Sequence, residues 1–292
     1  KHVLSAGDDN CKLWKYKDGT LHFCKHFDNH TKTVNCVLVN SNAPREFVSC
    51  SWDKTIRTFN IVSGHCINTI TSSQTIASLA WWKHGSYLIE GGGTPYYILV
   101  RKWDKQDYTS CEHGKVIASL KGHKLDVYIL HVDESKQQLL SSGDDGIIIL
   151  WSLSSFQQVQ KFESPSYITA ICKLGTSVYA CAGSYRTFIS FYNMESNTSI
   201  TATGAFYLTI YAMVHVDSKK LLITVSDDAT VKVWKVNTNC NDCKVQFAVN
   251  SPFNTICKSL VLLDEQRVLV GDEFGNFFIL DVDMGTIECK VT

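Results

Sequence analysis

A short phrase recurs along the whole chain at nearly even intervals. Each copy has a tight polar turn, usually with Asp, then alternating apolar residues, then a large apolar or aromatic residue six positions after the Asp. The copies are clearest as SWDKTIRTF, SGDDGIIILW and SDDATVKVW, which begin at Ser51, Ser142 and Ser226. The closing residues lie 45, 44, 48, 40, 43 and 46 positions apart, and they are Trp14, Phe59, Trp103, Trp151, Phe191, Trp234 and Leu280.

A fixed period of this length indicates a repeat architecture. A strand-turn-strand pattern within each repeat is typical of a propeller blade. We therefore predict an all-β chain that folds as a seven-bladed β-propeller of four-stranded antiparallel blades. A propeller grows by adding blades around one axis, so residues 1–292 are expected to form one domain. The expected blades are residues 1–27, 28–70, 71–120, 121–163, 164–202, 203–248 and 249–292.

The first repeat is shorter than the others. Residues 1–7, 11–16 and 20–27 alternate like a second, a third and an outermost strand, and no segment supplies the innermost one. The second repeat, in contrast, has four alternating runs at 34–40, 45–50, 55–61 and 65–70. We expect the first blade to lack its innermost strand and the chain to be a fragment of a longer protein.

The charge balance excludes a bulk electrostatic attraction to polyanions. Lys plus Arg and Asp plus Glu both number 28, so we expect no nucleic-acid partner. No apolar run approaches the roughly 18 residues of a spanning helix, and the first ten residues lack the apolar core of a signal peptide. We expect no transmembrane segment, and a cytoplasmic or nuclear location.

The 12 cysteines are expected to be free thiols, because most of them fall at alternating strand positions. Two groups have metal-like spacing: Cys240 with Cys243, and His22 with Cys24 and His26. A zinc site needs four converging ligands, and neither group has a visible second half. We therefore predict no metal and no cofactor.

Four residues of the fourth repeat carry a family resemblance: His123, Ser141, Asp145 and Trp151. With the period, they make the chain resemble the WD-repeat (WD40-type) propeller family. The resemblance implies that His, Ser or Thr, Asp and Trp join in a hydrogen-bonded tetrad that fixes each blade. Partial sets are His30, Ser49 and Asp53 with Phe59 in the second repeat, and Thr224, Asp228 and Trp234, with no His near Gly204, in the sixth. Repeats three, five and seven have Tyr97, Tyr185 and Phe274 at the Asp position, so their tetrads are expected to be broken.

The tetrad must be distinguished from a hydrolase triad, which also uses Ser, His and Asp. A triad needs an exposed nucleophile and an oxyanion hole, whereas Ser141 is predicted to lie inside a strand. The Gly91-Gly92-Gly93 run lacks the Lys-Ser/Thr of a phosphate-binding loop and is expected to be a widened hairpin turn. We predict that the chain is not an enzyme and has no small-molecule substrate. The alternative is a hydrolase at the channel mouth of the propeller.

The favoured hypothesis is an adaptor that presents loop faces to peptides or domains of other proteins in a multisubunit complex. Residues just before the structural Asp of each turn are expected to point to solvent. The candidate partner-binding residues are Trp52, Asp144, Asp227, Asp9, Asp272 and Glu273. An exposed aromatic residue beside carboxylates suits a basic segment. The alternative is that paired Asp residues only favour tight turns, and Lys32, Lys124 and Arg186 would dilute an acidic field.

Overall fold

The computed structural model describes residues 1–40, 43–104, 107–164, 166–184, 188–203, 208–237 and 243–291. Within these ranges the regular structure is β-strand, apart from a single 3-10 turn at Asp217–Lys219. The chain divides into two compact units, Lys1–Glu163 and Ser164–Thr292. That all 292 residues form one domain stays a prediction.

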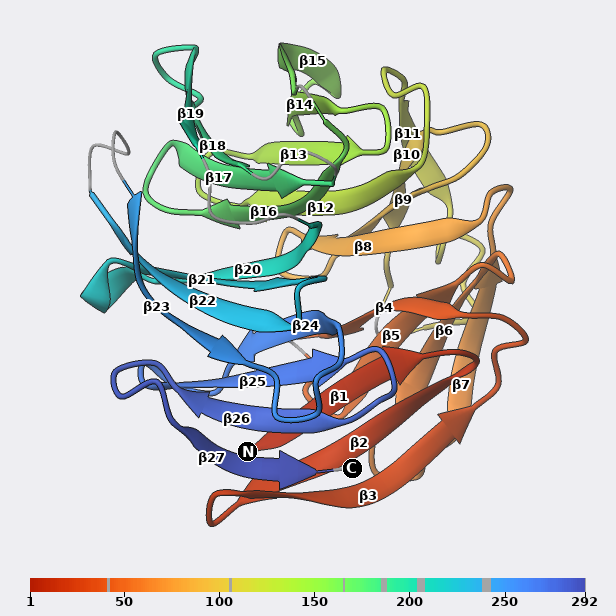
Figure 1. The fold of residues 1–292 in the computed structure, drawn as a ribbon. Helices are drawn as coiled ribbons and strands as arrows, with labels where there is room; N and C mark the ends of the chain where they lie inside the picture. The colour runs from red at the N-terminus through yellow and green to blue at the C-terminus, as the bar shows by residue number, and fades with distance from the viewer. Residues whose placement is uncertain are drawn as a thin grey trace. The chain divides into compact units, whose positions relative to one another are not determined.

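The first unit contains four sheets (Figure 1). Blade one has three strands, β1 (His2–Gly7), β2 (Asn10–Lys17) and β3 (Thr20–Asp28). Blade two is β4 (Val34–Val39), β5 (Glu46–Ser51), β6 (Thr55–Asn60) and β7 (Cys66–Thr71). Blade three is β8 (Ile76–Trp82), β9 (Tyr87–Gly92), β10 (Ile98–Lys102) and β11 (Val116–Leu120). Blade four is β12 (Val127–Asp133), β13 (Gln138–Gly143), β14 (Ile147–Ser152) and β15 (Gln157–Glu163).

The second unit contains three four-stranded sheets. Blade five is β16 (Ile168–Lys173), β17 (Val178–Gly183), β18 (Phe188–Asn193) and β19 (Thr198–Thr203). Blade six is β20 (Ile210–Val216), β21 (Leu221–Ser226), β22 (Thr230–Val236) and β23 (Cys243–Asn250). Blade seven is β24 (Cys257–Leu262), β25 (Arg267–Asp272), β26 (Phe277–Asp281) and β27 (Ile287–Val291). The fold class is thus the predicted seven-bladed β-propeller, and its first blade has three strands.

The middle strands of the complete blades are buried and the outermost strands are half exposed. In β13 five of six residues are buried, whereas β15 exposes five of seven. Val, Ile and Leu dominate the buried strands because branched side chains pack well on a pleated surface that is covered on both faces. Apolar clusters lie between neighbouring blades: Ile89 of blade three packs in the same cluster as Ile149 of blade four.

Each complete blade carries a β-bulge at the same place on its first strand. The bulged residues are Asn35, Ala77, Tyr128, Thr169, Tyr211 and Lys258. A glycine stands opposite the bulge in three blades, at Gly92, Gly143 and Gly183. A Cβ at each of them would lie 1.9 Å from a backbone carbonyl oxygen of the first-strand side. Gly92 is the last residue of β9, and its backbone lies very close to the backbone of the first-strand side. This corrects the expected widened hairpin turn at residues 91–93.

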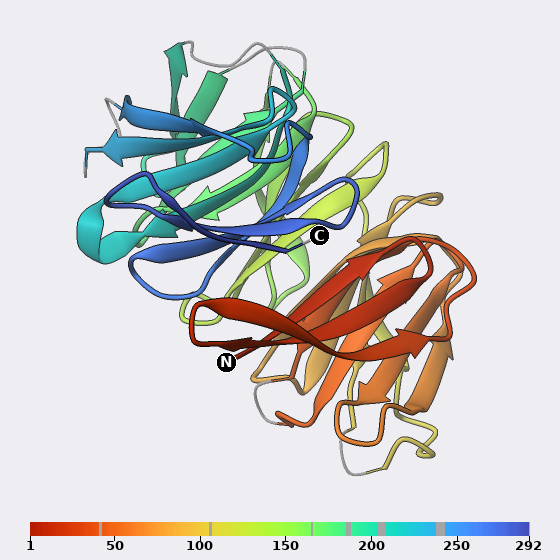
Figure 2. The same cartoon turned by 60° about the horizontal axis from the view of Figure 1, so that its bottom comes forward.

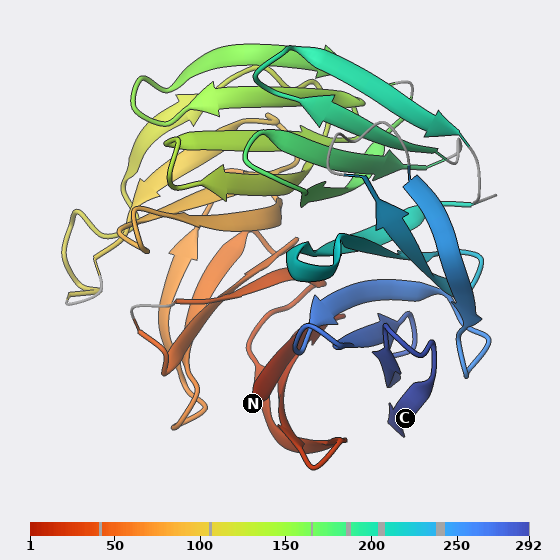
Figure 3. The ribbon, with the colours of Figure 1, turned by 90° about the vertical axis from the view of Figure 1, so that its left-hand side faces the viewer.

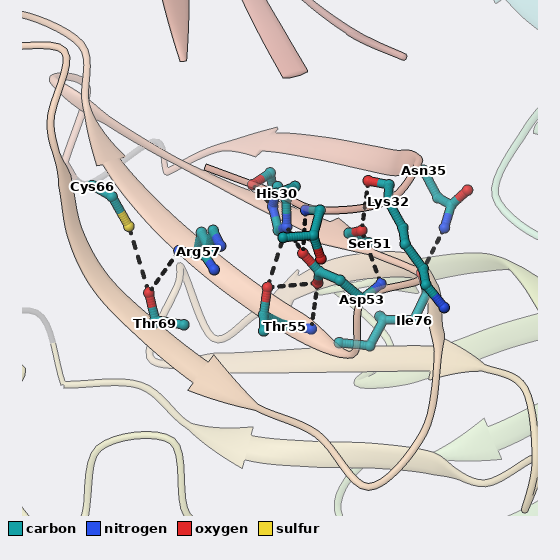
Figure 4. A network of polar contacts seen from close by, with 12 residues as sticks. His30, Lys32, Asn35, Ser51, Asp53, Thr55, Arg57, Cys66, Thr69 and Ile76 are labelled. Carbon is teal, nitrogen blue, oxygen red and sulfur yellow. Dashed lines mark hydrogen bonds and ion pairs between the residues drawn. The ribbon is translucent and has the colours of Figure 1, made fainter. Parts of the chain in front are cut away.

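Side chains at the bulges join neighbouring blades. Asn35 Nδ2 donates to the Ile76 carbonyl of the next first strand at 2.8 Å (Figure 4). Ser78 Oγ donates in the same way to the Val127 carbonyl at 3.0 Å, and Thr169 Oγ1 donates to the Ile210 carbonyl. Because the accepting residue begins the bulge in each case, the bulge supplies the carbonyl that the preceding blade binds.

Blade four has a complete polar network. His123 Nδ1 lies 2.9 Å from Asp145 Oδ2, and His123 Nε2 lies 2.7 Å from Ser141 Oγ. Trp151 Nε1 donates to the same Ser141 Oγ at 2.8 Å. Burial opposes ionisation of Asp145, but hydrogen bonds from His123 and two backbone N–H groups outweigh it and lower the pKa of Asp145. The carboxylate therefore holds the start of β14 and the segment before β12 together.

Blade two has the same network without the indole (Figure 4). His30 lies 2.8 Å from Asp53 and 2.7 Å from Ser49, while Thr55 Oγ1 donates to Asp53 at 2.6 Å. Phe59 takes the Trp position and stacks on Phe47, with ring centroids 5.1 Å apart. The lost indole donor is thus replaced by apolar packing.

Blades one and six contain parts of the network. Trp14 Nε1 donates to Ser5 Oγ at 3.0 Å, and Trp234 Nε1 donates to Thr224 Oγ1 at 3.0 Å. In blade six Lys232 Nζ donates to Asp228 at 2.9 Å, and the lysine is 11% exposed. A lysine from the third strand therefore bonds the Asp of the turn, as a histidine does in blade four.

Blade three contains a different network, and its position corrects the alignment of Trp103. Arg101, not Trp103, is the strand residue opposite Leu88, just as Trp151 is opposite Leu139. Arg101 Nε donates to Glu90 Oε2 at 2.8 Å, and Ser72 Oγ donates to Glu90 Oε1 at 2.5 Å. Because Glu90 is fully buried, this charge pair is the polar core of the blade.

Blade five differs from the prediction by one position. Tyr192, not Phe191, is paired with Tyr179, the counterpart of Leu139. Tyr185, the predicted occupant of the Asp position, lies outside the described residues. Counting a fixed number of positions to the closing residue therefore selects the wrong residue in blades whose turn has a different length.

We predict that Asp145→Ala destabilises the fold by about 1–3 kcal/mol, because His123 and two backbone N–H groups lose a buried acceptor. The neighbouring Asp144 is a matched control: its pKa is raised by burial and by the carboxylate of Asp126. Asp144→Ala should stay within about 0.5 kcal/mol of the wild type. Urea unfolding followed by tryptophan fluorescence measures both. Equal midpoints for the two variants would contradict the role assigned to Asp145.

We expect Arg101→Met to cost about 3–5 kcal/mol, because it leaves the buried Glu90 carboxylate without its cation. The double variant Glu90→Leu/Arg101→Met removes both charges and should be more stable than Arg101→Met alone. Chemical unfolding of the two variants gives the comparison. A double variant less stable than the single one would show that the ion pair is not the dominant polar contact.

The polar network of blade two predicts an acid-sensitive stability. Burial lowers the pKa of His30 below its ordinary 6.5, and Asp53 opposes this shift. The unfolded chain therefore binds a proton at His30 more tightly than the folded chain does, and stability falls as pH drops below 6.5. Burial alone would raise the pKa of Asp53, but hydrogen bonds from Thr55 and His30 outweigh it and lower this pKa from 3.8 to about 2. The contribution of Asp53 to stability is lost as pH falls through that range. Unfolding midpoints measured across pH should fall less steeply for His30→Gln than for the wild type below pH 6.5. Identical slopes would contradict the neutral, buried state of His30.

Candidate functional site

Five of the six predicted partner-binding residues lie in turns between a second and a third strand, and the sixth, Asp272, is the last residue of the second strand β25. Trp52 lies between β5 and β6, Asp9 between β1 and β2, and Asp144 between β13 and β14, all in the first unit. The other three residues belong to the second unit: Asp227, Asp272 and Glu273. Their common role as a binding face stays a prediction.

Trp52 is an exposed aromatic residue on a rigid turn. Its residue surface is 43% exposed. The turn beneath it is fixed because Asp53 accepts from Thr55 and the Asp53 backbone N–H donates to Ser51 Oγ at 3.0 Å. Lys54 has a φ of +67°, a left-handed conformation that this turn requires. A large exposed indole held in one place is a suitable anchor for a partner.

Asp144 belongs to an acidic and aromatic cluster that sequence analysis did not find. Tyr128, the bulged residue of β12, lies near the carboxylates of both Asp126 and Asp144. Burial and these two carboxylates raise the pKa of Tyr128 to about 12. Burial and the nearby Asp126 also raise the pKa of Asp144. Two partly exposed carboxylates that repel each other would both be stabilised by an incoming cation.

Asp227 has a cation within its own unit. Lys258 Nζ lies 3.8 Å from Asp227 Oδ1 and 3.4 Å from the ring centroid of Tyr211. Burial and the nearby Asp227 raise the pKa of Tyr211. Tyr211 and Lys258 are the bulged residues of β20 and β24, so the bulges bring these groups together. Asp227 is therefore a weaker attractor for a basic partner than Asp144.

Asp272 is buried and differs from the expected exposed carboxylate. It accepts from Thr255 Oγ1 at 2.6 Å, from the Phe274 backbone N–H at 2.9 Å and from Asn276 Nδ2 at 2.8 Å. These bonds make it the cap of the β25–β26 turn, the role that Asp145 has in blade four. Glu273 is exposed, and Phe274, at the predicted Asp position, is 75% exposed. Asp9 is exposed beside Asn10.

A Ser-His-Asp triad is not formed in blade four. Ser141 is fully buried, and its hydroxyl is engaged by both His123 and Trp151. In the described parts of the chain no group of three or more His, Cys, Asp or Glu side chains is placed to hold a metal ion. Cys240 lies outside the described residues, while His22, Cys24 and His26 are exposed on β3. Among the described helical segments, none has the length and apolarity needed to cross a bilayer.

The positions that sequence analysis missed are Asp126, Tyr128, Tyr211 and Lys258. Each of them directly follows or precedes the first apolar residue of a first strand. A strict alternation of buried and exposed residues treats these positions as ordinary strand side chains. The bulge shifts the alternation by one residue and turns these side chains toward the neighbouring turn. A polar or aromatic residue recurring at this one position of the repeat was the available signal.

Comparison with known proteins gives both a family and several relatives. The family model "WD domain, G-beta repeat" matches residues 21–60, 114–152 and 200–235. The chain is 27% identical over 151 residues to the U3 small nucleolar RNA-associated protein 15 homolog of Gallus gallus, covering 52% of this chain and 27% of that protein.

Two further relatives have a similar degree of identity. The ribosome biogenesis protein YTM1 of Ajellomyces capsulatus is 27% identical over 130 residues, covering 44% of this chain and 25% of that protein. The autophagy-related protein 16 of Arabidopsis thaliana is 24% identical over 148 residues, covering 50% of this chain and 27% of that protein. The matched region spans only about a quarter of the length of each of these relatives. Three segments of the chain thus match the WD-repeat model, and the structure has the seven blades of a β-propeller.

Proposed function

We propose that the chain is a non-catalytic interaction scaffold that binds a basic segment of a partner protein at the turns before its third strands. The observation that carries the proposal is the Asp126–Tyr128–Asp144 cluster, whose carboxylates lie outside the tetrad of blade four. The tetrad residues hold the turn, so the cluster residues are free to bind a partner without loss of the fold.

A basic partner segment fits the charges of this cluster. Burial and repulsion by Asp126 raise the pKa of Asp144, and a Lys or Arg side chain between the two carboxylates would relieve that repulsion. Leu125 and Tyr128 are exposed beside the carboxylates and would cover the aliphatic stem of such a side chain. Trp52 offers an aromatic anchor in the same unit.

The names of the relatives support a place in a multiprotein complex. Two of them are named for ribosome biogenesis and for association with the U3 small nucleolar RNA. We propose a nuclear location for this chain on that basis. We propose that this chain contacts protein, because it has no net charge to attract a polyanion. The expectation of no nucleic-acid contact stays a prediction.

An enzymatic role is the alternative, and no observation favours it. The one Ser-His-Asp set found by sequence analysis is used in a buried tetrad. We therefore propose a scaffold and not a hydrolase.

The proposal predicts the outcome of a pull-down from nuclear extract. The triple variant Trp52→Ala/Asp144→Lys/Asp227→Lys should lose partners that the wild type recovers, because it removes the anchor and reverses two charges. Asp144→Lys should account for more of the loss than Asp227→Lys, since Lys258 already neutralises Asp227. Mass spectrometry of the recovered proteins measures the loss and identifies the partner.

A matched control is Val62→Ala/Asp18→Lys. Val62 is 67% exposed and the Asp18 side chain is 82% exposed, and both lie in turns away from the candidate residues. This variant should recover the same partners as the wild type. If the folded triple variant also recovers them, the turns before the third strands are not the main binding site.

A further inference from the structure

Blades four and six repeat one arrangement of side chains at the start of the first strand. The bulged residue is a tyrosine in both, Tyr128 of β12 and Tyr211 of β20. The residue after the second strand is an aspartate in both, Asp144 and Asp227. β12 is drawn in yellow-green in Figure 2, and β20 is drawn in teal in Figure 3. The bulged residues of the other four complete blades are not tyrosines, so the arrangement sets these two blades apart.

The backbone holds the tyrosine and the aspartate in the same relation in both blades. In blade four the Asp144 N–H donates to the carbonyl of Asp126 at 3.1 Å, two residues before the tyrosine. In blade six the Asp227 N–H donates to the carbonyl of Thr209 at 3.0 Å, again two residues before the tyrosine. The two turns are therefore equivalent, and the difference between them lies in the side chains that surround them.

Each tyrosine lies near a second carboxylate as well. It is Asp126 in blade four, and it is Glu273, from the neighbouring blade seven, in blade six. Burial and the two carboxylates raise the pKa of the tyrosine hydroxyl in both cases. We call the two sets the blade-four cluster, Asp126, Tyr128 and Asp144, and the blade-six cluster, Tyr211, Asp227 and Glu273. An aromatic ring beside two carboxylates favours a bound cation.

A cation of the chain itself fills the blade-six cluster. The Nζ atom of Lys258 lies 3.4 Å from the ring centroid of Tyr211 and 3.8 Å from Asp227 Oδ1. Lys258 belongs to β24, which contacts β20 within the second unit. Burial lowers the pKa of Lys258, and the carboxylates of Asp227 and Glu273 oppose that shift. The ammonium is thus held by the ring and by both carboxylates, as a bound ligand would be.

The blade-four cluster has the same groups without a cation. Across the part of the chain that the structure describes, no Lys, Arg or His side chain forms an ion pair with Asp126 or Asp144. Burial and Asp126 raise the pKa of Asp144, whereas an ammonium group in contact with it would lower this pKa. Tyr128 is 38% exposed, while Tyr211, under its lysine, is half-buried. The surface that Lys258 covers in blade six is therefore open in blade four.

We infer that the blade-four cluster binds a lysine side chain of the partner, and that Lys258 is a built-in occupant that closes the equivalent cluster of blade six. The ammonium of the partner lies over the Tyr128 ring and beside Asp144, as that of Lys258 lies in blade six. This inference rests on the proposed scaffold function and names the residue of the partner that the cluster recognises. Because the cluster holds a charge, acetylation of that lysine prevents binding.

A short neutral peptide with one lysine, acetyl-Gly-Ser-Lys-Ser-Gly-amide, is the probe for the test. It is titrated into the 292-residue chain with isotope-labelled tyrosine rings, whose magnetic resonance signals are assigned with Tyr128→Phe and Tyr211→Phe. In the wild type the peptide should shift the Tyr128 signals with saturation and leave the Tyr211 signals in place. In Lys258→Met, which removes the ammonium and keeps an unbranched stem, both tyrosines should shift.

The signals of Tyr211 decide the role of Lys258. If they stay in place in Lys258→Met, the common mode of binding is refuted. If they shift as much in the wild type as in Lys258→Met, Lys258 does not close the cluster. Tyr128 reports from the same sample, so its unchanged response shows that the variant is folded, and Lys258→Gln, as a second variant, should behave in the same way.

Two modified peptides and one pair of variants test the charge. Replacing the lysine of the peptide with ε-acetyl-lysine or norleucine should weaken binding to the blade-four cluster at least about tenfold. Asp144→Asn should weaken the lysine peptide at least about fivefold, while Asp18→Asn, on a side chain that is 82% exposed in another turn, should leave it unchanged. Equal binding of the acetylated and unmodified peptides would overturn the inference.

The titration and the pull-down fail separately. If the peptide does not shift Tyr128 while the triple variant still loses partners, the lysine-binding cluster is refuted and the scaffold proposal stands. If the peptide shifts Tyr128 with saturation while the triple variant recovers every partner, the scaffold proposal fails at these turns and the lysine-binding cluster stands.

Discussion

The structure depends on one requirement: a polar side chain buried in the second strand of a blade must have a partner. Ser141 and Ser49 are satisfied by a histidine, and Thr224 is satisfied by an indole. Glu90, at the equivalent position of blade three, is satisfied by an arginine from the third strand. Cys181 and Val270 take this position in blades five and seven, where no such network is needed. The polar networks therefore differ because the buried residue differs, while the sheet stays the same.

The repeated bulge connects this scaffold to its surface chemistry. A bulge adds one residue to a strand whose neighbours are fully paired, so that residue is directed out of the regular pleat. In blades two and five it bonds the next blade, through Asn35 and Thr169. In blades four and six a tyrosine takes the same position and lies near acidic residues. One backbone feature thus either joins blades or builds a surface cluster, according to the residue placed on it.

Much of the fold could be predicted from the sequence because the repeat period survives where individual residues do not. Trp14, Trp151 and Trp234 mark the third strands correctly, since each bonds its second-strand partner. The prediction fails at Trp103, where alternation cannot distinguish a buried Arg101 from an exposed one. Pairing of Arg101 with Glu90 depends on contacts between strands that a single sequence does not show. The candidate site was found only in part, because the bulges that place Tyr128 and Lys258 leave no separate signal in the alternation.

The composition of β1 differs from that of a protected sheet edge. Sheet edges that stay exposed usually carry lysine, proline or an inward-pointing charge that prevents association. The sequence HVLSAG of His2–Gly7 has no proline and no Lys, Arg, Asp or Glu. Val3, Leu4 and Ser5 are only partly covered, and Ser5 already has an indole donor in place. An edge without protective residues, beside a network that lacks one member, has the properties of the six second strands that are paired on both sides.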